Sequence, residues 1–75
     1  GKVVGIKQYL EENDILPRET MAFGDGENDI EMLEAAGIGI AMGNADDMVK
    51  KSADYVTDSV DNDGIGKALR YFQII

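Results

Sequence analysis

The chain has 75 residues, a net charge of −8 and no cysteine. The length allows at most one small domain, and the missing cysteines exclude disulfides and leave nothing that suggests a zinc site. The acidic balance argues against binding to nucleic acid or to anionic membranes, because such binding depends on Lys and Arg. With no signal peptide and no apolar run of membrane-spanning length, we expect a cytoplasmic protein without membrane association.

Apolar residues recur at helical spacing at the start of the chain, where Val3, Ile6 and Leu10 predict an amphipathic helix over residues 3–13. Beyond Pro17, short apolar runs alternate with helical patterns. The runs predict strands over residues 20–24, 39–42 and 55–57, and the patterns predict helices over residues 28–36, 45–52 and 65–72. This alternation implies right-handed crossovers and a parallel sheet. The expected fold is α/β, a partial Rossmann-like three-layer sandwich of about three parallel strands with four flanking helices.

Two residues are expected at helix ends. Gly37 follows the second helix, where a glycine C-cap is common. Asn44 precedes the third helix and is expected to act as its N-cap. Because Asn44 also follows the second strand, at the same sheet edge as Asp25, a contact with substrate is the alternative for Asn44.

The most informative segment is residues 23–32, Phe-Gly-Asp-Gly-Glu-Asn-Asp-Ile-Glu-Met. It places Asp25, Asn28 and Asp29 between an apolar strand and a helix. Ligands of open α/β sheets bind at the carboxyl ends of the strands. Hard divalent cations such as Mg²⁺ take one or two carboxylates together with phosphate oxygens of the substrate. Judged by residue types alone, a surface turn rich in Gly and Asp is an equally good interpretation.

Several short sequence motifs follow one another along the chain. They are Gly24-Asp25-Gly26-Glu27-Asn28-Asp29, Met32-Leu33, Gly37-Ile38-Gly39-Ile40-Ala41-Met42-Gly43-Asn44-Ala45, Val49-Lys50, Ala53-Asp54-Tyr55-Val56-Thr57 and Asp63-Gly64-Ile65. With these motifs, residues 2 to about 69 resemble the C-terminal part of a haloacid dehalogenase superfamily phosphatase. The resemblance is to the Cof-like type, which hydrolyses small phosphorylated metabolites.

The resemblance implies roles for four residues. Asp25 matches the family's Mg²⁺ ligand, and Asp29 matches a residue in the outer shell of the metal. Asn28 matches an amide that contacts the phosphate. Lys2 matches a lysine that neutralises charge on the nucleophile and on the transferred phosphoryl group.

Each of these residues also has a simpler interpretation. Asp25 is able to brace its turn, and Asn28 is able to act as an N-cap. Asp29 would interact favourably with the helix dipole as an acidic residue in the first helical turn. Lys2 is explained equally well as an exposed lysine, and Lys7 is its rival for the catalytic role.

The resemblance further implies hydrolysis through an aspartyl-phosphate intermediate. The family's nucleophile belongs to an Asp-x-Asp-x-Thr or Val motif after an apolar strand. Asp61-Asn62-Asp63 has the Asp-x-Asp spacing but lies in a polar, turn-like stretch. We therefore expect the 75 residues to be a fragment of a phosphatase core that is inactive alone. Such a fragment would be able to self-associate through an exposed sheet edge.

Two alternatives remain. The phosphorylation domain of a P-type ion pump shares Gly-Asp-Gly-x-Asn-Asp, but pumps usually continue with Ala-Pro-Ala-Leu where this chain has Ile30-Glu31-Met32-Leu33. A non-catalytic binding or oligomerisation module with the same fold is the alternative from a different class. The presence of Asp25, Asn28 and Asp29 together argues against it, because such a module does not need that combination.

Overall fold

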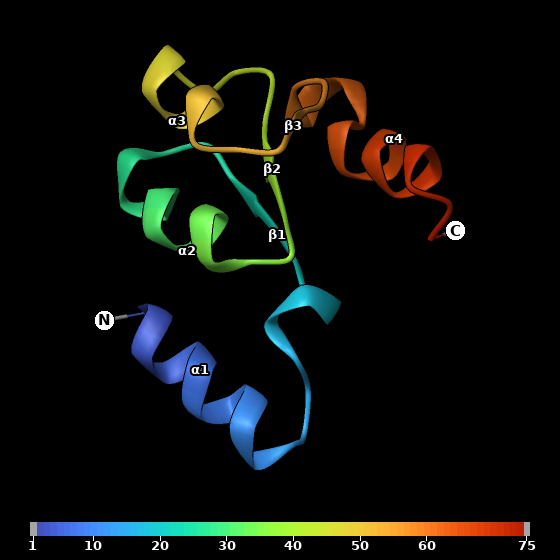
Figure 1. The fold of residues 1–75 in the computed structure, drawn as a ribbon. Helices are drawn as coiled ribbons and strands as arrows, with labels where there is room; N and C mark the ends of the chain where they lie inside the picture. Colours follow the sequence, from blue (N-terminus) through green and yellow to red (C-terminus); the bar gives the residue numbers. More distant parts are fainter. Residues whose placement is uncertain (1, 75) are drawn as a thin grey trace.

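A computed structural model describes the backbone of residues 2–74 and the side chains of residues 5–74. The elements follow one another along the chain in the order helix, strand, helix, strand, helix, strand, helix, joined by short 3₁₀ turns (Figure 1). They are α1 (Lys2–Glu12), η1 (Pro17–Glu19), β1 (Met21–Gly24), η2 (Glu27–Asp29), α2 (Ile30–Ala35), β2 (Ile38–Ala41), α3 (Asp47–Lys51), β3 (Tyr55–Val56), η3 (Val60–Asn62) and α4 (Gly64–Tyr71).

The three strands form one parallel sheet in the order β1-β2-β3. Met21 lies beside Ile38, Gly24 beside Ala41, and Ile40 beside Tyr55. In this register the carboxyl ends of the strands meet along one edge of the sheet. The α/β class with three parallel strands and four helices, predicted from the sequence, is confirmed.

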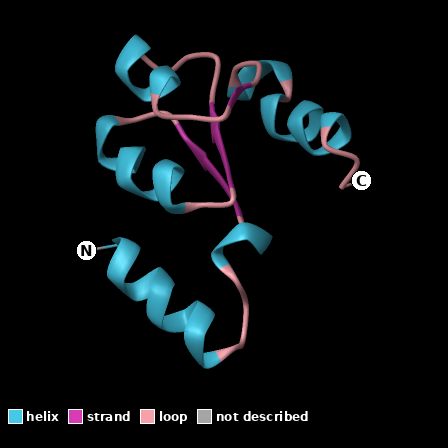
Figure 2. Ribbon diagram, in the orientation of Figure 1, coloured by secondary structure: helices cyan, strands magenta, loops and turns pink. Residues whose placement is uncertain are grey.

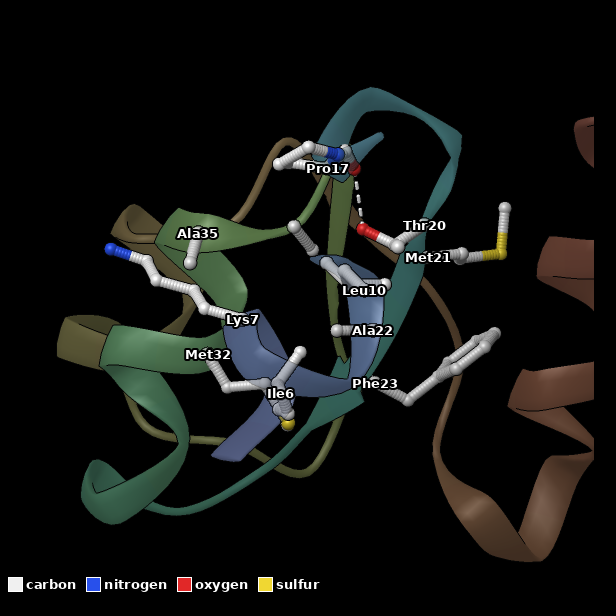
Figure 3. Close-up of a pocket in the computed structure, with 11 residues that line it drawn as sticks. Ile6, Lys7, Leu10, Pro17, Thr20, Met21, Ala22, Phe23, Met32 and Ala35 are labelled. Atoms are coloured by element: carbon white, nitrogen blue, oxygen red, sulfur yellow. Dashed lines mark hydrogen bonds between the residues drawn. The ribbon is translucent and has the colours of Figure 1, made fainter. Parts of the chain in front are cut away.

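Helices cover both faces of the sheet, with α1 and α2 on one side and α4 on the other (Figures 1 and 2). Side chains of β1 alternate accordingly, as expected for a strand. Ala22 lies toward Leu10 of α1, whereas Met21 and Phe23 point toward α4 (Figure 3). Met21, Ala22 and Phe23 are half-buried and Gly24 is buried, so the helices cover the two faces of this strand only in part.

The core lies between the sheet and helices α2 and α3. It contains Leu33, Ala41, Ala45 and Val49, all of which are buried. On the opposite face, the ring of Tyr55 stacks on Tyr71 with a centroid distance of 4.5 Å. Small residues on the strands let the helices approach the sheet closely, because a Cβ on Gly39 would collide with the backbone carbonyl of Leu33.

The expected cap residues are not the ones observed. Helix α3 begins two residues later than predicted, and its N-cap is Asp46, whose Oδ1 accepts a hydrogen bond from the Val49 N–H at 3.2 Å. The Asn44 prediction is wrong because the Ala45 N–H donates to the Met42 carbonyl at 2.9 Å, so a turn precedes the helix.

Gly37 also has another role than the one predicted. Helix α2 ends at Ala35, its C-cap Ala36 is extended, and no described glycine has a positive φ. A Cβ on Gly37 would lie 2.5 Å from the backbone oxygen of Arg18. The glycine is therefore required by a close approach of two backbone segments rather than by a left-handed conformation.

None of the helices in residues 2–74 is long and apolar enough to cross a membrane. Within the same residues, β1 pairs only with β2, so its outer edge has no strand partner. Association through this edge stays a prediction.

Candidate functional site

The candidate site lies where β1 and β2 end side by side. Asp25 directly follows β1, and Asn44 follows β2 by three residues. Both side chains are exposed, and Asn44 Nδ2 donates to Asp25 Oδ2 at 3.5 Å. The parallel register brings the two residues together across 19 positions of sequence. The sequence placed both residues at this edge but did not predict the hydrogen bond.

Asp29 fastens the turn that carries Asp25. Its half-buried carboxylate folds back, and Oδ2 accepts hydrogen bonds from the N–H groups of Asp25 and Gly26, both at 3.2 Å. The Asp29 N–H in turn donates to the Gly26 carbonyl at 2.9 Å. These contacts produce the short 3₁₀ turn η2, which is why α2 begins at Ile30 and not at residue 28 as predicted.

The two glycines beside Asp25 differ in how closely they are packed, because the exposed Asn28 side chain beside Gly26 is able to move whereas the Asp29 Cβ beside Gly24 is fixed to the backbone. A Cβ on Gly24 would lie 2.6 Å from the Asp29 Cβ, and a Cβ on Gly26 would lie 2.8 Å from Asn28 Oδ1. Real Cβ atoms do not approach other atoms so closely without displacement of a neighbour. A larger residue at position 24 would therefore move Asp29, which holds the backbone of Asp25.

We expect Gly24→Ala to lower the free energy of unfolding by about 1–3 kcal/mol, the usual cost of overpacking a close contact. Gly5→Ala is the matched control, because no atom lies within 4 Å of a Cβ built there. Gly5 lies inside α1, so its replacement by alanine should raise the free energy of unfolding by about 0.5–1 kcal/mol. Urea denaturation of both variants measures the difference. Equal stability of the two variants would contradict a close packing of Gly24 on Asp29.

The side chain of Asn28 is described by the structure, whereas that of Lys2 is not. Asn28 is exposed within η2, and the positions that precede η2 and α2 are occupied by Gly26 and Asp29, so Asn28 does not act as a helix N-cap. Lys2 begins α1, but its side chain lies outside the described part of the chain. Lys7, its rival, is exposed. The roles assigned to Lys2 and Asn28 stay predictions.

Residues after β3 are bound to α4. Lys67 Nζ donates to Asp58 Oδ2 at 2.8 Å, and the Ser59 N–H donates to Asp58 Oδ1 at 2.9 Å. The hydrogen bond from Lys67 is the larger of these two causes that lower the pKa of the Asp58 carboxyl below its ordinary value. Thr57 is buried, and its hydroxyl donates to the Gly64 carbonyl at 2.7 Å. The acidic residues of this loop, Asp58, Asp61 and Asp63, are exposed.

The donor set at Asp25 suits part of a site for a hard cation. Its exposed carboxylate offers oxygen ligands, which Mg²⁺ prefers, and Mg²⁺ commonly takes only one or two protein carboxylates. No three acidic, histidine or cysteine side chains converge on one point within the described residues. Asp29 turns Oδ2 toward the backbone, so its described contacts are those of a residue that supports Asp25.

An apolar hollow on the described surface lies elsewhere. It has a volume of about 410 Å³ and is formed by α1, β1 and α2, with mostly apolar residues around it (Figure 3). Asp25, Asn28 and Asn44 do not line it. The polar residues at the carboxyl ends of the strands are therefore the better candidate for phosphate chemistry.

The sequence and the fold agree with those of known proteins. A family profile described as haloacid dehalogenase-like hydrolase matches residues 1–69, and the chain belongs to this family. The resemblance inferred from the motifs is thereby confirmed. The chain is 44% identical over 72 residues to a 5-amino-6-(5-phospho-D-ribitylamino)uracil phosphatase of Bacillus subtilis. That match covers 96% of this chain and 29% of the relative.

Two solved structures are similar over most of the chain. One is a phosphatase of the haloalkanoate enzyme superfamily from Bacteroides thetaiotaomicron, with 51% identity, a TM-score of 0.95 and coverage of 100% of this chain. The other is a subclass IIB sugar phosphatase, with 54% identity, a TM-score of 0.92 and coverage of 95% of this chain. The chain spans only 28% and 27% of these two structures, respectively.

Proposed function

We propose that the chain forms the cation- and phosphate-binding part of a Mg²⁺-dependent phosphatase that hydrolyses small phosphorylated metabolites, such as sugar phosphates. One observation carries the proposal: an exposed carboxylate, Asp25, stands at the carboxyl end of β1 on a turn that Asp29 holds. The similar proteins, a 5-amino-6-(5-phospho-D-ribitylamino)uracil phosphatase and a sugar phosphatase, support the substrate class.

In the proposed reaction, a carboxylate from outside these 75 residues attacks phosphorus and forms an aspartyl-phosphate. The bond between phosphorus and the substrate oxygen breaks, and that oxygen takes a proton from solvent, so the product leaves as an alcohol. Water then attacks the aspartyl-phosphate, breaks its bond between phosphorus and the carboxylate oxygen, and releases inorganic phosphate and the free carboxylate. Asp25 holds Mg²⁺, and Asp29 supports Asp25. Asn28 donates its amide N–H to a phosphoryl oxygen, and Lys2 offsets negative charge at the same group. When bound, Mg²⁺ would offset the repulsion between the nucleophile and the phosphoryl oxygens.

The test is phosphate release by the purified full-length protein from a panel of sugar phosphates and other phosphorylated metabolites. We expect EDTA to lower the rate by about a hundredfold or more and added Mg²⁺ to restore it, because the metal stabilises the charged transition state by several kcal/mol. The 75-residue chain alone should release no phosphate above a metal-only control. Release that is insensitive to EDTA would refute Mg²⁺ dependence. No release by the full-length protein would favour a non-catalytic binding module.

The cytoplasmic location stays a prediction.

A further inference from the structure

The side chain of Asn44 makes a hydrogen bond that is not a helix cap. It is exposed and does not cap α3, since Asp46 does so. Its amide nitrogen instead donates to Asp25 Oδ2. This hydrogen bond joins the ends of β1 and β2 through side chains, at the point where the proposed cation would bind.

The backbone that carries Asn44 is held from both sides. The Met42 N–H donates to the Gly24 carbonyl at 2.9 Å, and the Gly43 N–H donates to the Asp58 carbonyl at 3.2 Å. A Cβ on Gly43 would lie 2.9 Å from the backbone oxygen of Thr57, so the segment packs closely against the end of β3. Asn44 therefore projects from a segment tied to both neighbouring strands.

The chemistry of an amide suits this position. The amide is neutral, so it donates a hydrogen bond to the carboxylate without adding positive charge. A lysine at this position would compete with a cation for the Asp25 carboxylate. A carboxylate at position 44 would instead repel Asp25. A donor on Oδ2 restrains the orientation of the Asp25 carboxylate and leaves the lone pairs of Oδ1 for a metal. Groups that orient a metal ligand in this way commonly affect metal affinity.

We propose that Asn44 is a positioning residue that holds the Asp25 side chain for Mg²⁺, while Asp29 holds the Asp25 backbone. This inference rests on the proposed function, because it assigns Mg²⁺ to Asp25. Asn44 acts through Asp25 and does not contact the substrate. Its loss therefore weakens Mg²⁺ binding and leaves the binding of a phosphorylated substrate at saturating Mg²⁺ nearly unchanged.

The test is a calorimetric titration of the full-length protein with MgCl₂. Asn44→Leu removes the donor at similar size and should raise the Kd for Mg²⁺ about tenfold, the lower end of the range for such supporting residues. Asn44→Gln keeps an amide donor on a longer side chain and should raise the Kd for Mg²⁺ less than Asn44→Leu does. Asn62→Leu is the matched control, because Asn62 is an exposed asparagine that donates to Asp58 and Ser59 and not to Asp25. It should leave the Kd unchanged.

Other results would overturn the inference. The inference would be overturned if the Asn44→Leu variant bound Mg²⁺ as tightly as the unmodified protein. A raised KM for substrate with an unchanged Kd for Mg²⁺ would show direct substrate contact instead. An unmodified protein that binds no Mg²⁺ would refute both this inference and the proposed metal dependence. Binding of Mg²⁺ without any phosphate release would refute only the proposed function. If Asn44→Leu does not fold by circular dichroism, Asn44→Ser replaces it, since the serine hydroxyl is too short to restore the contact and the same increase in Kd is expected.

Discussion

Replacing Asp25 with asparagine should lower Mg²⁺-dependent phosphate release by the full-length protein about a thousandfold. The substitution keeps the size of the side chain but removes the negative charge that would hold the cation at the end of β1. A bound metal contributes several kcal/mol of charge stabilisation in the transition state, and about 4 kcal/mol corresponds to three powers of ten in rate. The measurement is kcat/KM for the best substrate of the panel at saturating Mg²⁺.

Asp14→Asn is the matched control for this prediction. It makes the same change of charge at an exposed residue that follows α1. Asp14 precedes β1 in the chain, whereas Asp25 follows the carboxyl end of β1. Asp14 has a φ of 55°, a conformation that asparagine tolerates well, so the variant should fold normally. Its kcat/KM should equal that of the unmodified protein. An Asp25→Asn enzyme with activity close to that of Asp14→Asn would remove Asp25 from the proposed metal site.

Leu33→Ala should lower the free energy of unfolding by about 3 kcal/mol, within the usual range for a buried leucine. Leu33 is 1% exposed and packs in the core with Ala41 and Val49. Its removal would leave a cavity between α2 and the sheet. This cost is a large share of the stability of a typical domain, which is about 5–15 kcal/mol. Urea denaturation measures the change.

Leu16→Ala is the control for packing, because Leu16 lies before η1 and is 45% exposed. The same deletion of atoms at a half-exposed position should cost less than about 1 kcal/mol. Comparable losses in the two variants would contradict the assignment of Leu33 to the core between α2 and the sheet.

The strands could be located from the sequence to within one residue at each end. The expected runs over residues 20–24, 39–42 and 55–57 correspond to Met21–Gly24, Ile38–Ala41 and Tyr55–Val56. The central strand β2 is apolar because it is largely buried, so its burial is visible in local composition. The starts of α2 and α3 were less accurate. They depend on which side chain folds back onto the backbone, which residue types alone do not determine.

The sequence by itself determined where the candidate site lies. The spacing of Asp25, Asn28 and Asp29 after an apolar run places them at the carboxyl end of a strand, because strand and turn are local structures. Only the tertiary structure decided how Asn44 is used. Its hydrogen bond to Asp25 depends on the parallel register of β1 and β2, which brings residues 19 positions apart to the same edge. The close approach of Gly37 to Arg18 was decided in the same way. Contacts between segments distant in the chain follow from packing of the whole domain, and no local pattern records them.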